Sequence, residues 1–405
     1  MFDVTEIKNI ISKNKIKYDK LYKNSFFDKI FNMSTIKGAS TILIYFILFG
    51  LIHHKIPLDF MKDVINNKKT DIYQIDNSGL SALYWLMFEE KSWSEKVLNL
   101  FLTNKKMKIN NEIFEGGYTI LICACFFHNV KFVKQILKNP KVNVNLLNVN
   151  KNSALIATLD NKEYLNSDEK RNYQKNAISI IKELYKIKNI NVNIKNVDGW
   201  SVLHHAVMND KYPFNIFREV LKHPKIDVNI KYQGDTLLHF IIKMQLNPGF
   251  LKELLKHPKI NVNQKNKDGD SAIFYIVSQF KQHENYSKYL ELLLNHKKID
   301  KILKNSNDGN NTILISLILE FQMFSSFVYT KILLDHFTIK SKSFYTEMIE
   351  TLNVFFSSPE YNKIINKNKL KKLFKNKKNK DFIKNTKKMI TELNMENLFF
   401  IFHKK

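Results

Sequence analysis

The chain has 405 residues, of which 44% are hydrophobic, so it can bury a large core and wholesale disorder is excluded. Its 10 glycines and 7 prolines are too few for sheet sandwiches with many tight turns, and they suit helices joined by short polar loops. The formal net charge of +26 comes almost entirely from lysine, since Arg171 and Arg218 are the only arginines. Proteins that recognise phosphates rely heavily on arginine, so this charge indicates an AT-rich coding sequence more than a nucleic-acid partner.

The N-terminal residues 1–37 have helical periodicity and predict a polar-faced helical cap. Residues 1–21 lack the apolar core of a secretory signal. The most apolar run, Ala39–Ile52, is shorter than the ~20 residues that span a bilayer, so we expect a buried helix there. These features predict a chain without a transmembrane segment, located in the cytoplasm, with the nucleus or a host cytoplasm as alternatives.

A repeated unit follows from about residue 38 to residue 340. Its ending is nearly identical in three copies, LKNPKVNVN from Leu137, LKHPKIDVN from Leu221 and LKHPKINVN from Leu255. One hydroxyl residue opens each unit, with steps of 34 to 48 residues between successive copies, at Thr41, Ser81, Thr119, Ser153, Ser201, Thr236, Ser271 and Thr312. A leucine or isoleucine follows each hydroxyl by two positions, and in five units a glycine precedes it by two. Such a register indicates a stacked array.

Each unit predicts two helices. The glycine permits a tight turn, and the Ser or Thr caps the first helix by accepting a hydrogen bond from a free backbone amide. Apolar residues at three- and four-residue spacing, such as Phe250, Leu251, Leu254 and Leu255, form the second helix. Pro140, Pro224 and Pro258 then end it, and an extended Asn-Val-Asn stretch leads to the next turn.

This unit resembles the ankyrin repeat, whose first helix begins Thr-Pro-Leu-His. Ser201, Leu203 and His204 match that signature, as do Thr236, Leu238 and His239, although the motif proline and the glycine that ends the first helix are missing. The resemblance implies an all-α ankyrin-repeat solenoid of about eight helix-turn-helix units with helical caps. It is similar to the divergent ankyrin proteins of large DNA viruses and protists, which are often aimed at host proteins.

No catalytic or metal site is expected. The sequence has no phosphate-binding loop, HExxH helix or nucleophile elbow. Cys123 and Cys125, the only cysteines, lie two apart on a helix and are interpreted as free buried thiols. The resemblance gives His204 and His239 a structural bond near the turn. We therefore predict a non-enzymatic protein without a cofactor or metal.

The resemblance places partner contacts on the turn tips and on the exposed side of the first helices. Trp200, Tyr232 and Tyr118 are the preferred anchors, because aromatic side chains dominate interface hot spots. The alternative for Trp200 is that it packs on its neighbouring turn and contacts no partner. The full predicted set is Tyr118, Phe126, Phe127, Val197, Asp198, Trp200, Met208, Tyr232, Gln233, Asp235, Lys243, Met244, Lys267 and Asp270.

The C-terminal residues 341–405 are expected to be helical and contain the lysine-rich run Asn366–Lys380. Two functions follow for the monomer that we expect. The first is a scaffold or adaptor that holds an unidentified protein on its concave face and turn tips. The alternative is an anionic-surface binder, for nucleic acid or membrane, that acts through surface lysines and this run.

Overall fold

The computed structural model of the chain describes residues 43–44, 46–47, 56–68, 70–75, 79–87, 92–160, 167–208, 213–279 and 286–299. The chain divides into two compact units, Met1–Asp227 and Val228–Lys405. The predicted cap at 1–37, the hydroxyl that opens the first repeat, the predicted eighth repeat and the C-terminal segment at 341–405 with its lysine run lie outside the described residues.

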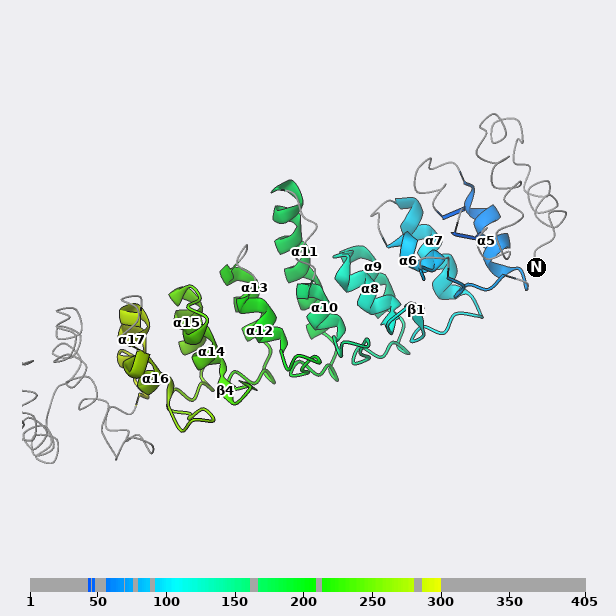
Figure 1. Ribbon diagram of the computed structural model, residues 1–405. Coiled ribbons are helices and arrows are strands. Elements are labelled where there is room, and N and C mark those ends of the chain that lie inside the picture. Colours follow the sequence, from blue (N-terminus) through cyan, green and yellow to red (C-terminus); the bar gives the residue numbers. More distant parts are fainter. Residues whose placement is uncertain are drawn as a thin grey trace, which may run out of the picture. The chain divides into compact units, whose positions relative to one another are not determined.

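Helix pairs build the first unit (Figure 1). Its elements are α5 (Leu58–Asn66), α6 (Ala82–Leu86), α7 (Ser92–Thr103), β1 (Glu112–Phe114), β2 (Tyr118–Thr119), α8 (Ile120–Phe126), α9 (Val130–Leu137), α10 (Ala154–Asp160), α11 (Ser167–Tyr185), α12 (Val202–Val207) and α13 (Pro213–Leu221). The first helices α6, α8, α10 and α12 pack on one another in order, and the second helices α7, α9, α11 and α13 form a parallel row.

The second unit repeats the same plan. Its elements are β3 (Lys231–Tyr232), β4 (Asp235–Thr236), α14 (Leu237–Lys243), α15 (Pro248–Leu255), α16 (Ala272–Gln279) and α17 (Tyr286–Leu294). Helix α14 packs on its own second helix α15 and on the next first helix α16. In both units the second helices α9, α13 and α15 end three residues before Pro140, Pro224 and Pro258, as the sequence predicts.

The predicted turns are confirmed in detail. The Ser81 and Thr119 side chains accept hydrogen bonds from backbone amides of α6 and α8, and Ser201 forms a capping box with His204. All five glycines that precede the cap by two have positive φ, from 75° at Gly79 to 87° at Gly234. In the Ser153 repeat, which lacks this glycine, Lys151 occupies the same position with φ 56°.

Two features were not anticipated. The tips are short antiparallel hairpins, β1–β2 and β3–β4, and single bridges such as Lys195 to Ser201 take their place in other repeats. The 48-residue step from Ser153 to Ser201 is partly absorbed by α11, which has 19 residues where α9 has 8.

The core lies between the two helix rows. Helix α8 is buried at six successive residues, Ile120–Cys125, because it packs on first helices on both sides as well as on α9. Helix α9 buries one stripe, Phe132, Val133 and Ile136, and leaves its lysines outside. The free thiols of Cys123 and Cys125 are buried as expected, and burial raises the pKa of both.

The Asn-Val-Asn stretch connects each repeat to the next. Its first asparagine closes a local turn, as Asn191 does by accepting from the Asn193 amide, and its valine is buried, as Val192 is. The second asparagine spans the repeats: Asn193 Nδ2 donates to Lys225 O at 2.8 Å, and Asn193 Oδ1 accepts from the Asp227 amide at 2.9 Å. We call this pair of bonds the asparagine clamp.

The clamp recurs at equivalent positions within each unit. Asn110 and Asn145 bond in the same way to the repeats that follow them, and so does Asn229 in the second unit. Each clamp forms hydrogen bonds with one backbone carbonyl and one backbone amide of an irregular loop. These two groups have no partner within the helices of their repeat. The stacking register therefore depends on one side chain per repeat.

Asn193→Ala is expected to lower the free energy of unfolding by about 2 kcal/mol, because it removes both clamp bonds at about 1 kcal/mol each. Asn193→Asp keeps the acceptor and loses the donor, so it should cost about half as much. Urea denaturation of the full chain measures both. Asn150→Ala, at an exposed tip position, is the control; an equal loss in the control would contradict the clamp.

The helix ends explain how the chain tolerates the missing motif glycine. Helix α14 ends with Leu246 N donating to Ile241 O and Gln245 N to Ile242 O, a closure that requires a left-handed residue at Gln245. Gln245 has φ 49°, and His128 has φ 57° at the same point after α8. Both residues carry the strain that glycine avoids.

Gln245→Gly should therefore raise the free energy of unfolding by about 1 kcal/mol, since the exposed Gln245 side chain is replaced by a residue without a Cβ. Thermal unfolding of the full chain measures the change. Gln245→Ala keeps the Cβ and should bring no gain. A glycine variant that is less stable than wild type would show that Gln245 is not strained.

Candidate partner-binding face

The most distinctive surface of the first unit is a group of aromatic rings on the first-helix side of two adjacent repeats. The rings come from α6, from the β1–β2 hairpin and from the end of α8, which lie next to one another (Figure 1). All are half-buried. We name them the aromatic cluster, which consists of Tyr84, Trp85, Phe114, Tyr118, Phe126 and Phe127.

The rings form one continuous network. Tyr84 lies at the centre, with ring centroids 4.8 Å from Phe114 and 5.2 Å from Phe127. Tyr118 stands 5.2 Å from Phe114 and 6.2 Å from Phe126. Edge-to-face and tilted pairs of this kind contribute about 1 kcal/mol each, so the rings hold one another in place without a partner. Burial raises the pKa of Tyr84 and Tyr118, so both hydroxyls stay neutral.

Apolar tip residues extend this surface along the first unit. Val149, 66% exposed, lies against the Gly116 turn and donates its amide to Gly116 O at 2.8 Å. Val197, 55% exposed, donates its amide to Asn150 O at 2.9 Å. The tips are therefore linked by backbone bonds, and they present branched apolar side chains outward.

Gly117 is required by this linkage. An added Cβ would lie 3.2 Å from the Asn148 Cα, and its φ of 76° is left-handed. A side chain at residue 117 would separate the hairpin from the following tip.

The predicted anchors Trp200 and Tyr232 are half-buried and pack on their own repeats. The Trp200 ring lies edge-on to His205 at 5.5 Å, and its amide donates to Asn196 Oδ1 at 2.8 Å. The Tyr232 ring contacts Phe240 at 5.8 Å, and its hydroxyl accepts from Gln233 Nε2. Both rings therefore contact the first helix of their own repeat, and each keeps an exposed part.

Two predicted contact residues are internal partners of each other. Lys243 Nζ lies 2.7 Å from Asp235 Oδ2 and 4.8 Å from the centroid of the Tyr275 ring. Asn266 donates to the other Asp235 oxygen at 3.0 Å. This arrangement ties consecutive repeats of the second unit together, so both charges already have a structural role.

The other predicted residues are distributed over the two units. Phe126 and Phe127 belong to the aromatic cluster, while Asp198 is exposed and Met208 half-buried in the first unit. In the second unit Gln233, Met244 and Lys267 are exposed, and Asp270 is half-buried. Tyr84, Trp85 and Phe114 were missed. Tyr84 follows its capping Ser81 by three positions, as His204 follows Ser201.

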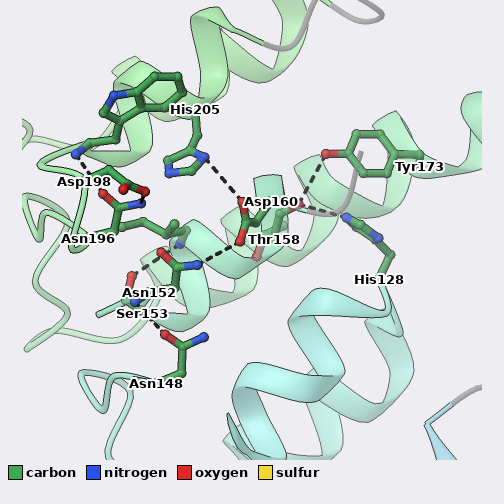
Figure 2. A network of polar contacts seen from close by, with 12 residues as sticks. His128, Asn148, Asn152, Ser153, Thr158, Asp160, Tyr173, Asn196, Asp198 and His205 are labelled. Carbon is green, nitrogen blue, oxygen red and sulfur yellow. Dashed lines mark hydrogen bonds and ion pairs between the residues drawn. The ribbon is translucent and has the colours of Figure 1, made fainter. Parts of the chain in front are cut away.

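A polar network connects three successive repeats of the first unit (Figure 2). His128 Nε2 and the Tyr173 hydroxyl both bond to Thr158 O, at 2.8 and 3.5 Å, across α8, α10 and α11. Asp160, at the end of α10, accepts from Asn152 at 2.8 Å and lies 3.8 Å from His205 Nδ1. These contacts join helix ends and caps, and their role is structural.

The motif histidines also have the predicted structural role. His204 Nδ1 lies 2.8 Å from Ser201 Oγ, and His239 bridges Thr236 Oγ1 at 2.7 Å and Asp270 O at 3.0 Å. Burial lowers the pKa of each to about 4. His223, His257 and His296 each accept a backbone amide two residues on. Within the described part of the chain, no three His, Cys, Asp or Glu side chains gather as a metal site.

Stacked helix pairs, hairpin tips and capping histidines define a helical repeat protein. Residues 172–266 match the family model for ankyrin repeats, which spans three copies. The chain therefore contains ankyrin repeats and has the ankyrin-repeat fold.

Solved ankyrin structures resemble the chain. An ankyrin repeat domain from Acinetobacter baumannii is 19% identical, with a TM-score of 0.40, over 53% of this chain and 96% of that one. The ankyrin repeat domain of Bcl-3, a member of the IκB family, is 16% identical, with a TM-score of 0.43, over 56% and 91%.

A chain in the complex of a predatory endopeptidase from Bdellovibrio bacteriovorus with its immunity protein is 22% identical, with a TM-score of 0.38, over 54% and 98%. Among curated proteins, none matches the sequence. No helix in the described residues is long and apolar enough to cross a membrane.

Stability should fall as the pH drops from 6.5 to 4. In that window the unfolded state, with a histidine pKa of 6.5, binds protons that buried His204 and His239 do not, so protonation favours unfolding. The expected slope is about 1.4 kcal/mol per pH unit for each histidine. His239→Asn should flatten the curve of unfolding midpoint against pH. A variant curve parallel to that of wild type would show that His239 does not contribute.

Proposed function

We propose that the chain is a protein–protein interaction scaffold that holds a protein partner on the aromatic cluster and the adjoining tips of the first unit. Ankyrin repeats are in general protein-interaction modules, and the family match over residues 172–266 supports this role for the chain. The observation that carries the proposal is the aromatic cluster itself, six half-buried rings on one surface. Monomeric proteins rarely expose such patches without a function.

Three properties support binding at this surface. Tyrosine and tryptophan bury much area for little loss of side-chain entropy, so they act as hot spots. The ring network is already ordered, which lowers the cost of association. Exposed Val149 and Val197 supply an apolar extension along the tips. A partner segment with aromatic or branched apolar side chains fits this surface.

The finer parts of the proposal concern its setting. We propose an adaptor without catalytic activity, working as a monomer in the cytoplasm or in a host cytoplasm. Two unpaired thiols, Cys123 and Cys125, are compatible with a reducing compartment. Trp200 and Tyr232 are proposed as secondary contacts. A purely anionic binding role through lysines is the alternative that the experiment distinguishes.

The experiment is a capture from nuclease-treated cytosol at low and raised salt, followed by titration with the purified partner. Tyr118→Ala with Phe127→Ala should weaken binding about 30-fold or more, because each hot-spot ring contributes about 1–2 kcal/mol. Tyr118→Phe keeps the ring and should bind like wild type, and Trp200→Ala with Tyr232→Ala should have a smaller effect. Two results together would reject this face in favour of lysine-driven binding: raised salt abolishes capture, and the variant with Tyr118→Ala and Phe127→Ala still captures the partner.

A further inference from the structure

A lysine-lined groove runs between the second helices α7 and α9. None of its lining residues belongs to the aromatic cluster. Its volume is about 1390 Å³. We name it the lysine groove, after the seven lysines that line it, Lys96, Lys105, Lys108, Lys131, Lys134, Lys138 and Lys141. We propose that this groove binds an acidic, amphipathic peptide segment of a protein.

The charge of the groove exceeds what the composition of the chain explains. Lysines are seven of the 21 lining residues, whereas Lys and Arg together are 64 of 405 in the chain. Glu95 is the one carboxylate in the lining, and it pairs with Lys131 at 2.7 Å. Among the described residues, no carboxylate lies within ion-pair distance of Lys96, Lys105, Lys108, Lys138 or Lys141. The groove therefore has unpaired positive charge to offer an anion.

The walls of the groove are held in place. Lys131 bonds to the Glu95 side chain, and Gln135 Nε2 donates to the Glu95 backbone oxygen at 3.2 Å, so α9 is tied to α7 at two points. Lys131, Lys134 and Lys138 follow one another at three- and four-residue spacing, which places them on one side of α9. Lys131 already pairs with Glu95, and Lys134 lies 3.8 Å from Glu183 on α11, so Lys138 is the lysine of this row that has no carboxylate partner among the described residues.

The floor of the groove selects the class of ligand. Leu58, Leu100, Leu102 and Met107 line it and are half-buried, so apolar side chains lie among the lysines. The lining contains no aromatic ring for base stacking and no arginine for bidentate phosphate contacts. A peptide that alternates carboxylates with leucine-sized side chains satisfies both the rim and the floor.

The dimensions suit a short segment. Helix α7 has 12 residues and is therefore about 18 Å long. That length accommodates about three turns of a helix or about six residues of an extended chain. The groove contains none of the aromatic cluster residues, so the two surfaces can be tested independently.

The test uses a fluorescently labelled, helix-forming peptide of glutamate and leucine, about 12 residues long, and measures its anisotropy with the full chain. Lys96→Glu with Lys138→Glu should weaken binding about tenfold or more. The matched control is Lys175→Glu with Lys182→Glu on α11, two exposed lysines outside the groove, which should change binding less than about twofold. Lys105→Glu with Lys108→Glu reverses two further groove charges, in the loop after α7, and should also weaken binding. Circular dichroism checks that each variant is folded.

Further probes decide between ligand classes. Leu100→Ala should weaken the glutamate–leucine peptide and leave an all-glutamate peptide unaffected, and Phe127→Ala should leave both unaffected. Equal losses in the groove and control reversals would overturn the groove as a site. Oligothymidylate and phosphatidylserine vesicles are tested in the same way. If either binds as tightly as the peptide, and if Lys96→Glu with Lys138→Glu weakens that binding, the peptide assignment is overturned.

Discussion

The asparagine clamp is the contact on which the rest of each unit depends. A helix pair cannot bury its apolar stripe alone, and the loops between pairs contain backbone groups that no helix satisfies. Asn193 solves the second problem by bonding a carbonyl and an amide of the next repeat, at 2.8 and 2.9 Å. The same geometry recurs at Asn110, Asn145 and Asn229, so each of these asparagines holds the loop that ends the following repeat. The sequence preserves this asparagine where it has lost the motif proline.

This regular stacking places two different surfaces on opposite helix rows. The first helices α6 and α8, with their tips, carry the aromatic cluster, whereas the second helices α7 and α9 carry the lysine groove. The first surface is suited to apolar side chains and the second to carboxylates, so their contributions to binding respond oppositely to salt. A scaffold with both could hold two segments of one partner or two partners at once.

Aromatic residues show how far sequence reasoning extends. Tyr118, Phe126 and Phe127 were predicted as contact residues from their place in the repeat, and the structure brings them into one cluster. Tyr84 was missed, because its ring meets Phe114 and Phe127 only when α6, the β1–β2 hairpin and α8 come together in the fold. Asp235 and Lys243 were expected to face a partner, but eight residues separate them and only the fold shows that they pair with each other. Contacts between side chains of neighbouring elements do not follow from periodicity alone.

The sequence by itself determined the repeat, the hydroxyl caps of its first helices and the ends of its proline-terminated second helices. Hydroxyl caps, positive-φ glycines and prolines act on the few residues next to them, so a local pattern is sufficient to predict them. Only the tertiary structure decided which exposed residues form a surface. The aromatic cluster joins residues from α6 to α8, and the lysine groove joins Lys96 to Lys141; both depend on how one helix pair rests on the next. That register is set by side chains that reach across repeats, such as Asn145 and Gln135, and no single repeat contains it.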